Sequence, residues 1–313
     1  MIPGSRHKPA VPIVTPMRTH PTMSEYLAGI YHGKVQKIAV NAGLGCPNRD
    51  GRCGTGGCVF CNNAAFSPRY ASECGGSITE QLAAGVQFFS RSGRNAGYLP
   101  YFQTYSNTYG ETQHLIDLYE EALGFPGAVG LVIATRPDCL AEDLLGYFEE
   151  RFGSRAPAGH PHLLLEVGVE STDDRTLRSI NRGHDFACAE TAVRELALRG
   201  IDVGVHLILG LPGESDEDFM LHADRISELP VKTLKLHHLQ VIEGTPLAEM
   251  YRADPGKFHL FTPEEYAHVV RSFLDRLRAD IAVDRLVSET PKGLVIAPAW
   301  GLKPSEFQEI YGF

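Results

Sequence analysis

The chain has 313 residues, of which 43% are hydrophobic and 21% are charged. This mixture is sufficient to bury a core, and it excludes a mainly disordered chain. The formal net charge of −9 excludes a global basic field that would gather nucleic-acid backbones, although a local basic groove stays open.

Targeting and membrane signals are absent from the sequence pattern. No stretch approaches about eighteen uninterrupted apolar residues, and the N-terminus has no basic segment followed by an apolar one. The sequence therefore predicts a cytoplasmic protein that neither spans a membrane nor carries a secretory signal. Residues 1–22 are rich in proline and have no periodicity, and we expect them to form a flexible N-terminal arm.

Short apolar runs alternate with helical patterns along the rest of the chain. Continuous Val, Ile and Leu predict strands that are covered on both faces, as in a parallel sheet. The expected strands are Val35–Val40, Tyr98–Gln103, Gly130–Thr135, Leu163–Val169, Asp202–Leu209 and Thr233–Leu239. The first expected helix begins after Ser77, which forms a capping-box pattern with Glu80. The later ones are Glu111–Leu123, Ala141–Arg151, Phe186–Arg199 and Ser215–Glu228, and Gly200 stands where a C-terminal cap glycine belongs.

Six β-then-α units predict an α/β fold, a partial (β/α)6 TIM-type barrel with right-handed connections. We expect the barrel to occupy residues 23–253. A small C-terminal α+β extension over residues 254–313 would hold a helix near Pro263–Ile281 and strands near Arg285–Ser288 and Leu294–Ala297. Polar or glycine-rich segments follow all six strands, so they should meet at the one mouth where such barrels keep their chemistry.

The loop after the first strand, residues 41–63, is the most informative segment. It carries Cys46, Cys53, Cys58 and Cys61 among many glycines. In a cytosolic protein such a cluster predicts metal binding before disulfides. Cys58-x2-Cys61 suits structural zinc or iron and sulfur about equally, and Cys74 is a further possible zinc ligand. The place of the loop, at the barrel mouth and facing the other polar loops, favours an iron–sulfur cluster with one open corner.

The sequence resembles the radical S-adenosylmethionine (radical SAM) superfamily, in particular its YhcC-like family, which is related to the catalytic subunit of Elongator. The resemblance covers about residues 24–310. It rests on Cys46-Pro47-Asn48-Arg49-Asp50-Gly51, Gly56-Gly57-Cys58-Val59-Phe60-Cys61-Asn62, Tyr101-Phe102-Gln103, Asn107-Thr108-Tyr109, Thr135-Arg136-Pro137-Asp138-Cys139, Ile180-Asn181-Arg182-Gly183-His184, His206-Leu207-Ile208-Leu209-Gly210-Leu211-Pro212-Gly213-Glu214, His237-His238-Leu239-Gln240-Val241 and Ala297-Pro298-Ala299-Trp300.

The resemblance implies a [4Fe-4S] cluster bound by Cys46, Cys58 and Cys61. Loop spacing alone leaves Cys53 open as the third ligand in place of Cys46, because Cys53-x4-Cys58-x2-Cys61 is nearer to the superfamily's usual spacing. The cluster would work with S-adenosylmethionine and with an electron donor such as flavodoxin or ferredoxin. The remaining cysteines form no second tight group, so no auxiliary cluster is expected.

The resemblance also implies contacts to S-adenosylmethionine. Phe60 would lie against the adenine, and Glu170 with Arg182 would form the polar pair at the amino acid end, where an arginine fork suits a carboxylate. His206 would reach the ribose or another part of the cofactor from the fifth strand. Asn107 and Thr108 stand where many radical enzymes place a Gly-Gly-Glu segment, which leaves the partner of the amine open. Phe60, the Glu170–Arg182 pair and His206 each have a plain alternative, which is a packed ring, a surface ion pair and a core histidine, respectively.

The predicted function is the reductive cleavage of S-adenosylmethionine to a 5′-deoxyadenosyl radical that acts on an unidentified substrate. Kinship with Elongator suggests RNA modification, which is a minority hypothesis because the chain is acidic. Lys232, Lys235, Lys257 and Lys292 are the few basic residues expected near the far rim, and a solvated face explains them equally well. A zinc-stabilised binding module without enzymatic activity is the alternative from another class. Cys139, beside the third strand's mouth, could trap a substrate radical, although a buried structural cysteine is the favoured interpretation.

Overall fold

The computed structural model describes residues 20–63, 70, 76–90, 96–291 and 293–313. Within these ranges the six expected strands are present, each within one residue of its predicted bounds. They are β1 (Val35–Val40), β2 (Gly97–Phe102), β3 (Gly130–Thr135), β4 (His162–Glu170), β5 (Asp202–Leu209) and β6 (Thr233–His238). The expected helices between them are α3 (Ile78–Phe89), α4 (Thr112–Leu123), α5 (Glu142–Phe152), α7 (Phe186–Leu198) and α8 (Asp216–Ser227), with the 3-10 turn η3 (Pro137–Cys139) after β3.

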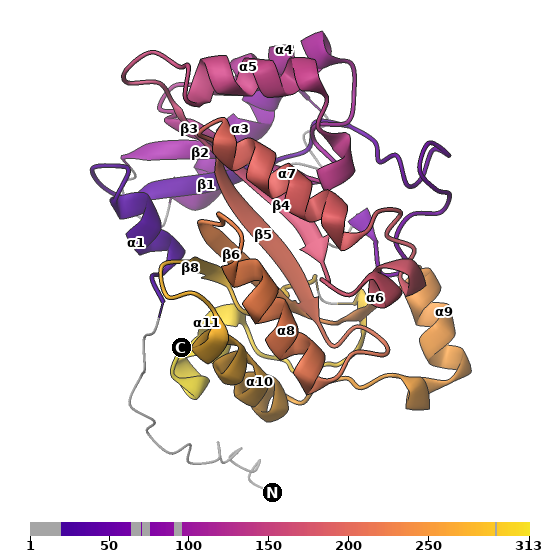
Figure 1. Cartoon of the computed structure of the whole chain (residues 1–313). Coiled ribbons are helices and arrows are strands. Elements are labelled where there is room, and N and C mark those ends of the chain that lie inside the picture. Colours follow the sequence, from indigo (N-terminus) through magenta and orange to yellow (C-terminus); the bar gives the residue numbers. More distant parts are fainter. Residues whose placement is uncertain (1–19, 64–69, 71–75, 91–95, 292) are drawn as a thin grey trace, which may run out of the picture.

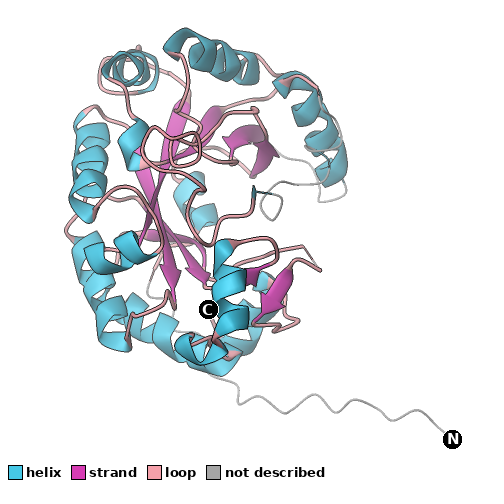
Figure 2. Ribbon diagram, turned by 90° about the vertical axis from the view of Figure 1, so that its right-hand side faces the viewer, coloured by secondary structure: helices cyan, strands magenta, loops and turns pink. Residues whose placement is uncertain are grey.

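All the strands of the main sheet run parallel, in the order β1-β2-β3-β4-β5-β6-β8. The sheet curls into a half-barrel, and helices follow its convex side (Figures 1 and 2). Alternate residues of β3 pack into two different cores: Leu131 and Ile133 contact the helices, whereas Val132 and Ala134 face the inside of the curve. Burial on both faces is the reason why these strands are continuously apolar, and the partial-barrel prediction is confirmed.

The seventh strand comes from the segment expected to form the C-terminal extension. β8 (Ala282–Arg285) lies slightly before the predicted strand at Arg285–Ser288 and pairs in parallel with β6, so it adds to the main sheet. Before it lie α9 (Pro246–Ala253), the 3-10 turn η4 (Pro255–Lys257) and α10 (Pro263–Arg276), which is shorter than predicted. β7 (Val241–Ile242) and β9 (Val295–Ala297) form a separate antiparallel pair, and α11 (Pro304–Tyr311) ends the chain.

A short helix, α1 (Met23–Ala28), closes the floor of the half-barrel. Its Met23 and Leu27 pack against the inward side chains of the first four strands. Thr22, just before the helix, forms a parallel bridge with Val283 of β8. The same segment therefore contacts the edge strand β8 as well as the first four strands. The expected N-terminal arm lies outside the described residues as far as residue 19. No helix in the described ranges is long and apolar enough to cross a membrane.

Candidate functional site

The loop that follows β1 lies at the mouth of the half-barrel and is fastened to segments distant in sequence. Val59 donates its backbone N–H to the carbonyl of Ile180 at 3.0 Å and accepts from Leu247 at 2.9 Å. Asn62 Nδ2 donates to the carbonyl of Glu243 at 2.8 Å. These contacts tie the cysteine loop to the end of α6 (Asp174–Ser179) and to the start of α9, which fixes the cysteines against the barrel.

Three of the loop's cysteines lie near one another. The pKa of the Cys61 thiol is raised to about 11, first by burial and then by the charge of Cys58, with a smaller contribution from Cys46. Cys58 is 5% exposed, and Cys46 and Cys61 are partly buried. The charges of Cys58 and Cys46 thus act on Cys61, and the charge of Cys46 also acts on Cys139.

Cys53 faces a different environment. Its side chain is exposed. Partial burial raises the pKa of its thiol, Asp138 adds to the rise, and Arg136 and Arg52 oppose it. The backbone N–H of Cys53 donates to the carbonyl of Pro47 at 2.8 Å, which fixes this turn of the loop. The charges that act on Cys53 are thus those of Asp138, Arg136 and Arg52, whereas those of Cys58 and Cys46 act on Cys61.

Three buried polar side chains surround Cys58. Asn48 Nδ2 lies 3.6 Å from the Cys58 sulfur, and Arg182 Nη1 lies 3.5 Å from it. Burial alone would lower the pKa of Arg182, but the charges of Cys58 and Glu170 outweigh it, and the pKa is raised. Arg136, 3% exposed, is held by both oxygens of Asp138, and Cys58 and Cys46 add to the rise in its pKa. The thiols thus stand beside two buried cations.

Several polar atoms in this group have no partner. Eight buried side-chain nitrogen or oxygen atoms among the described residues make no hydrogen bond, and four of them belong here: Asn48 Oδ1, Arg136 Nη1, Arg182 Nε and His184 Nε2. Buried polar atoms are rarely left unpaired in folded proteins, so such a concentration indicates the position of an absent group. Three thiols, two cations and these atoms fit a cluster with a bound polar ligand.

The described residues contain no three His, Cys, Asp or Glu side chains grouped closely enough to hold a single metal ion. The thiolates of a four-iron cube each bind a different iron, so they need not converge on one point. Cys74, the further possible zinc ligand, lies outside the described residues.

Glu170 and Arg182 meet at the end of β4, as their predicted pairing required. Their charged groups are 3.5 Å apart, and Arg182 Nη2 also donates to the carbonyl of Gly168 at 2.5 Å. A Cβ at Gly168 would stand 2.7 Å from both side chains, so only glycine leaves room for them. Glu170 has φ of 69°, a left-handed conformation that a glutamate rarely adopts. A strained residue that closes a strand at the barrel mouth points to a functional position.

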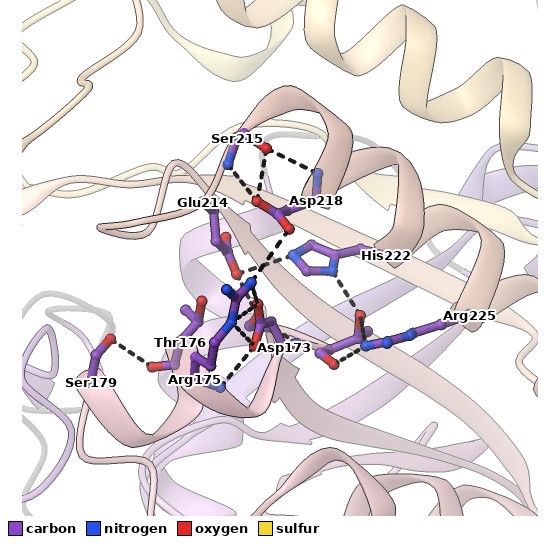
Figure 3. Close-up of polar contacts among 11 residues, drawn as sticks. Asp173, Arg175, Thr176, Ser179, Glu214, Ser215, Asp218, His222 and Arg225 are labelled. Carbon is purple, nitrogen blue, oxygen red and sulfur yellow. Dashed lines mark hydrogen bonds and ion pairs between the residues drawn. The ribbon is translucent and has the colours of Figure 1, made fainter.

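Buried hydrogen bonds from Ser171 to Glu214 and between Thr172 and His222 join the segments that follow β4 and β5. Glu214 accepts from Ser171 Oγ at 2.5 Å and from His222 Nε2 at 3.1 Å, and the Glu214 and His222 side chains are 0% and 1% exposed. His222 Nδ1 in turn lies 2.7 Å from Thr172 Oγ1. Figure 3 shows Glu214 and His222 pointing toward one another between the two loops. This network anchors the residues that directly follow Glu170.

The predicted pair Asn107 and Thr108 is buried between β2 and β3. Asn107 Nδ2 donates to the carbonyls of Phe102 and Ala134, both at 3.0 Å, and its Oδ1 has no partner. Thr108 Oγ1 lies 2.5 Å from Thr135 Oγ1. Both residues therefore hold the mouth loops together, and Asn107 retains one acceptor oxygen. Phe60 is partly buried and packs on the main core beside the cysteine loop.

His206 lies inside the half-barrel and takes part in a charged cluster. We name this cluster the barrel layer, and its members come from six strands: Lys37, Tyr101, Glu166, His206, Lys235 and Asp284. Glu166 accepts from Tyr101 Oη at 2.5 Å, Lys235 Nζ at 2.8 Å, His206 Nε2 at 2.9 Å and Lys37 Nζ at 3.3 Å. Lys37 and Lys235 also reach Asp284, at 2.9 and 3.2 Å. Lys235 is 6% exposed and points into the half-barrel toward Glu166, so the expectation that it lies on a rim or a solvated face is wrong.

The lysine charges control the acids of the barrel layer. Burial would raise the pKa of Glu166, but Lys235 and Lys37 outweigh it and hold that pKa well below its usual range. The same balance of burial against Lys37 and Lys235 lowers the pKa of Asp284 to about 2. Lys37 and Asp284 stand on the two edge strands, so their ion pair bridges the open sides of the sheet.

Two further points complete the site. Cys139 is 7% exposed, and burial is the main cause that raises the pKa of its thiol to about 12, which agrees with the buried structural cysteine favoured above.

Sequence reasoning missed the roles of Asn48 and Arg136, although both stand in motifs that it quoted. Their signal is their position beside a cysteine and after a strand, but only the fold shows that they converge on Cys58.

Comparisons with known proteins show the family of the chain. Residues 40–226 match the family described as the Radical SAM superfamily, and residues 231–311 match the Radical_SAM C-terminal domain. Protein YhcC of Escherichia coli (strain K12) is 35% identical over 273 residues, which cover 86% of this chain and 84% of that protein. The tRNA uridine(34) acetyltransferase of Methanocaldococcus infernus is 26% identical over 189 residues, 58% of this chain and 32% of that protein.

Among solved structures, the archaeal Methanocaldococcus infernus Elp3 with an N-terminal deletion has a similar fold. Its TM-score is 0.66 at 19% identity, and the alignment covers 90% of this chain and 62% of that one. The chain thus spans less than two thirds of the Elp3 structure but most of the length of YhcC. At this identity the likeness concerns the fold.

Proposed function

The chain belongs to the radical SAM superfamily, in its YhcC-like family related to Elongator, and from this we propose that it is an enzyme that binds a [4Fe-4S] cluster and cleaves S-adenosylmethionine. Cys46, Cys58 and Cys61 would hold the cluster. When bound, the cluster supplies one electron to S-adenosylmethionine, which gives methionine and a 5′-deoxyadenosyl radical that removes a hydrogen atom from the substrate.

One observation carries this proposal: at the mouth of a half-barrel the thiols of Cys46 and Cys58 act on Cys61 and on the buried guanidinium of Arg136, and Arg182 reaches the Cys58 sulfur. The two arginines compensate the negative charge that thiolates and a reduced cluster bring into a buried place. Three protein ligands leave one corner for the amine and carboxylate of S-adenosylmethionine, by the logic that leaves catalytic metals an open position.

The residues around this corner supply what the cofactor needs. Arg182 keeps an unpaired Nε for the methionine carboxylate, and Asn107 keeps an unpaired Oδ1 as an acceptor for the amine. Glu170 orients Arg182, while Thr108 fixes the loop through Thr135. These assignments are part of the proposal and rest on the chemistry of each free atom.

Two further residues would contact the nucleoside part of the cofactor. Phe60 supplies a flat apolar face for the adenine beside Cys61. His206 donates through Nε2 to Glu166, so its Nδ1 is the ring nitrogen left for the ribose.

The test is anaerobic reconstitution with iron and sulfide, followed by dithionite and S-adenosylmethionine. We expect about four irons per chain, the electron paramagnetic resonance (EPR) signal of a reduced [4Fe-4S] cluster, and 5′-deoxyadenosine detected by mass spectrometry. Zinc in natively purified protein, with no iron uptake and no 5′-deoxyadenosine, would instead support the zinc-stabilised binding module.

RNA is a candidate for the class of substrate on which the 5′-deoxyadenosyl radical would act. It is favoured by the similarity to a relative named tRNA uridine(34) acetyltransferase, although only 58% of this chain is matched. The net charge of −9 opposes a strong electrostatic contribution to binding. Retention of tRNA that weakens steeply with salt would support this candidate, and no retention at low salt would exclude it.

A further inference from the structure

Two nitrogen atoms point at a single sulfur in the cysteine loop. Asn48 Nδ2 and Arg182 Nη1 donate to the Cys58 sulfur at 3.6 and 3.5 Å. All three residues are buried, with 0%, 6% and 5% exposure. Both distances are within the range of hydrogen bonds to sulfur, and such bonds are worth most when the sulfur carries negative charge.

Asn48 is held rigidly in this position. Its Nδ2 also donates to the backbone carbonyl of Asn181 at 2.5 Å, and its own carbonyl accepts from Gly57 at 2.8 Å. Its Oδ1 has no partner and lies so close to Gly54 that a side chain there would collide with it. The amide therefore cannot swing away from Cys58 without losing a buried contact.

Anchoring the loop is mainly the work of a different asparagine. Asn181 Nδ2 donates to the backbone carbonyls of Gly57 and Thr55, at 2.8 and 3.2 Å. Asn181 adopts φ of 53°, a conformation that glycine also accepts. The chain thus contains two neighbouring asparagines, of which one binds the loop backbone and the other reaches the sulfur.

We propose that Asn48, together with Arg182, sets the reduction potential of the cluster through N–H···S hydrogen bonds to Cys58. This inference rests on the proposed function. Hydrogen bonds to ligand sulfurs and nearby positive charge both stabilise the more negative, reduced cluster, so they raise its potential. Asn48 is the better test of the two, because Arg182 is also assigned to S-adenosylmethionine.

The experiment is a redox titration of the reconstituted protein under anaerobic conditions, followed by the EPR signal of the reduced cluster. We compare Asn48→Leu, which removes the donor at similar size, with Asn181→Gly, which removes the loop anchor and keeps the backbone. For Asn48→Leu we expect about a tenfold lower ratio of reduced to oxidised cluster at a fixed potential, which corresponds to a shift of about 59 mV for one electron. Asn181→Gly should leave the potential unchanged.

An unchanged potential in Asn48→Leu, at full iron content, would overturn the inference. An equal shift in Asn181→Gly would also overturn it, because loop anchoring would then explain the effect.

If Asn48→Leu takes up no cluster, Asn48→Asp is used, and proton resonances of the wild-type cluster are compared in light and heavy water. Absence of an exchangeable proton coupled to the cluster would contradict the N–H···S bond. Failure of the wild-type chain to bind a cluster would overturn the proposed function itself, and it is recognised before any variant is measured.

Discussion

The half-barrel contains two buried clusters of charged residues, the barrel layer and the residues around Cys58. They differ in whether the described protein atoms supply every polar group with a partner. In the barrel layer, each charged group finds an opposite charge within the layer, and Glu166 alone accepts four hydrogen bonds. Around Cys58, by contrast, four buried polar atoms have no partner. Unpaired buried groups cost free energy, so a fold keeps them mainly where a ligand will satisfy them.

The two groups suit different roles within one barrel. The Lys37–Asp284 ion pair of the barrel layer bridges the edge strands, which suits a role in holding the half-barrel together. The group around Cys58 offers donors, an acceptor and cations to something that the chain does not supply. Mutations in the two groups should therefore fail in different ways.

The largest effect is expected for the cysteines. Cys46→Ala should lose the cluster and all 5′-deoxyadenosine formation, because a cube with two protein ligands is not retained. Cys53→Ala is the matched control from the same loop and should keep both, since Cys53 faces Asp138. Iron content and product formation measure the difference. An active Cys46→Ala beside a dead Cys53→Ala would reverse the ligand assignment.

The next largest effect lies in the barrel layer. Glu166→Gln removes one of the two carboxylates that pair with both lysines, and breaking a buried ion pair from one side costs about 3–5 kcal/mol. We expect that loss in the free energy of unfolding, measured with urea on the cluster-free protein. Glu243→Gln, which breaks an exposed pair with Arg252, should cost less than about 1 kcal/mol. Similar losses in both variants would refute the structural role of the barrel layer.

The sequence predicted the strands well and the short elements poorly, for physical reasons. Strands β3 and β5 are buried on both faces, so their apolar runs mark their ends. Helices α1 and α9 span only 6 and 8 residues, which is too short for a helical period to be recognised. Strand β8 has 4 residues and follows a helix outside the regular rhythm, so it was placed in the extension.

In the site, too, some features could be predicted from the sequence and others could not. The cysteine loop and the Glu170–Arg182 pair could be predicted because they stand in dense local motifs. The barrel layer could not, because Lys37, Glu166 and Lys235 are single charged residues in separate strands, and only the curvature of the sheet brings them together. Asn48 was inside a recognised motif, but its contact with the Cys58 sulfur depends on the folded loop.

A smaller effect is expected for the binding of S-adenosylmethionine. Arg182→Lys keeps the charge but loses the planar fork and the donor left for a carboxylate. We expect about a hundredfold weaker binding to the reconstituted protein by equilibrium dialysis, equivalent to about 3 kcal/mol. Arg175→Lys, at an exposed arginine paired with Asp173, serves as the control and should bind normally. Unchanged affinity in Arg182→Lys would remove Arg182 from the cofactor site.

The smallest effect depends on pH and concerns Asp284. Its pKa is about 2 in the folded chain, below the ordinary value of 3.8, so the folded state favours the charged form. Its contribution to stability is therefore complete above pH 3.8 and is lost as the pH falls toward 2. The shift corresponds to at most about 2.5 kcal/mol. Asp284→Asn should be less stable than the wild type at pH 6 in urea unfolding, and the difference should shrink below pH 4. A difference that stays constant between pH 6 and pH 2.5 would mean that Asp284 acts through packing, and the barrel layer would then lose its electrostatic link between the edge strands.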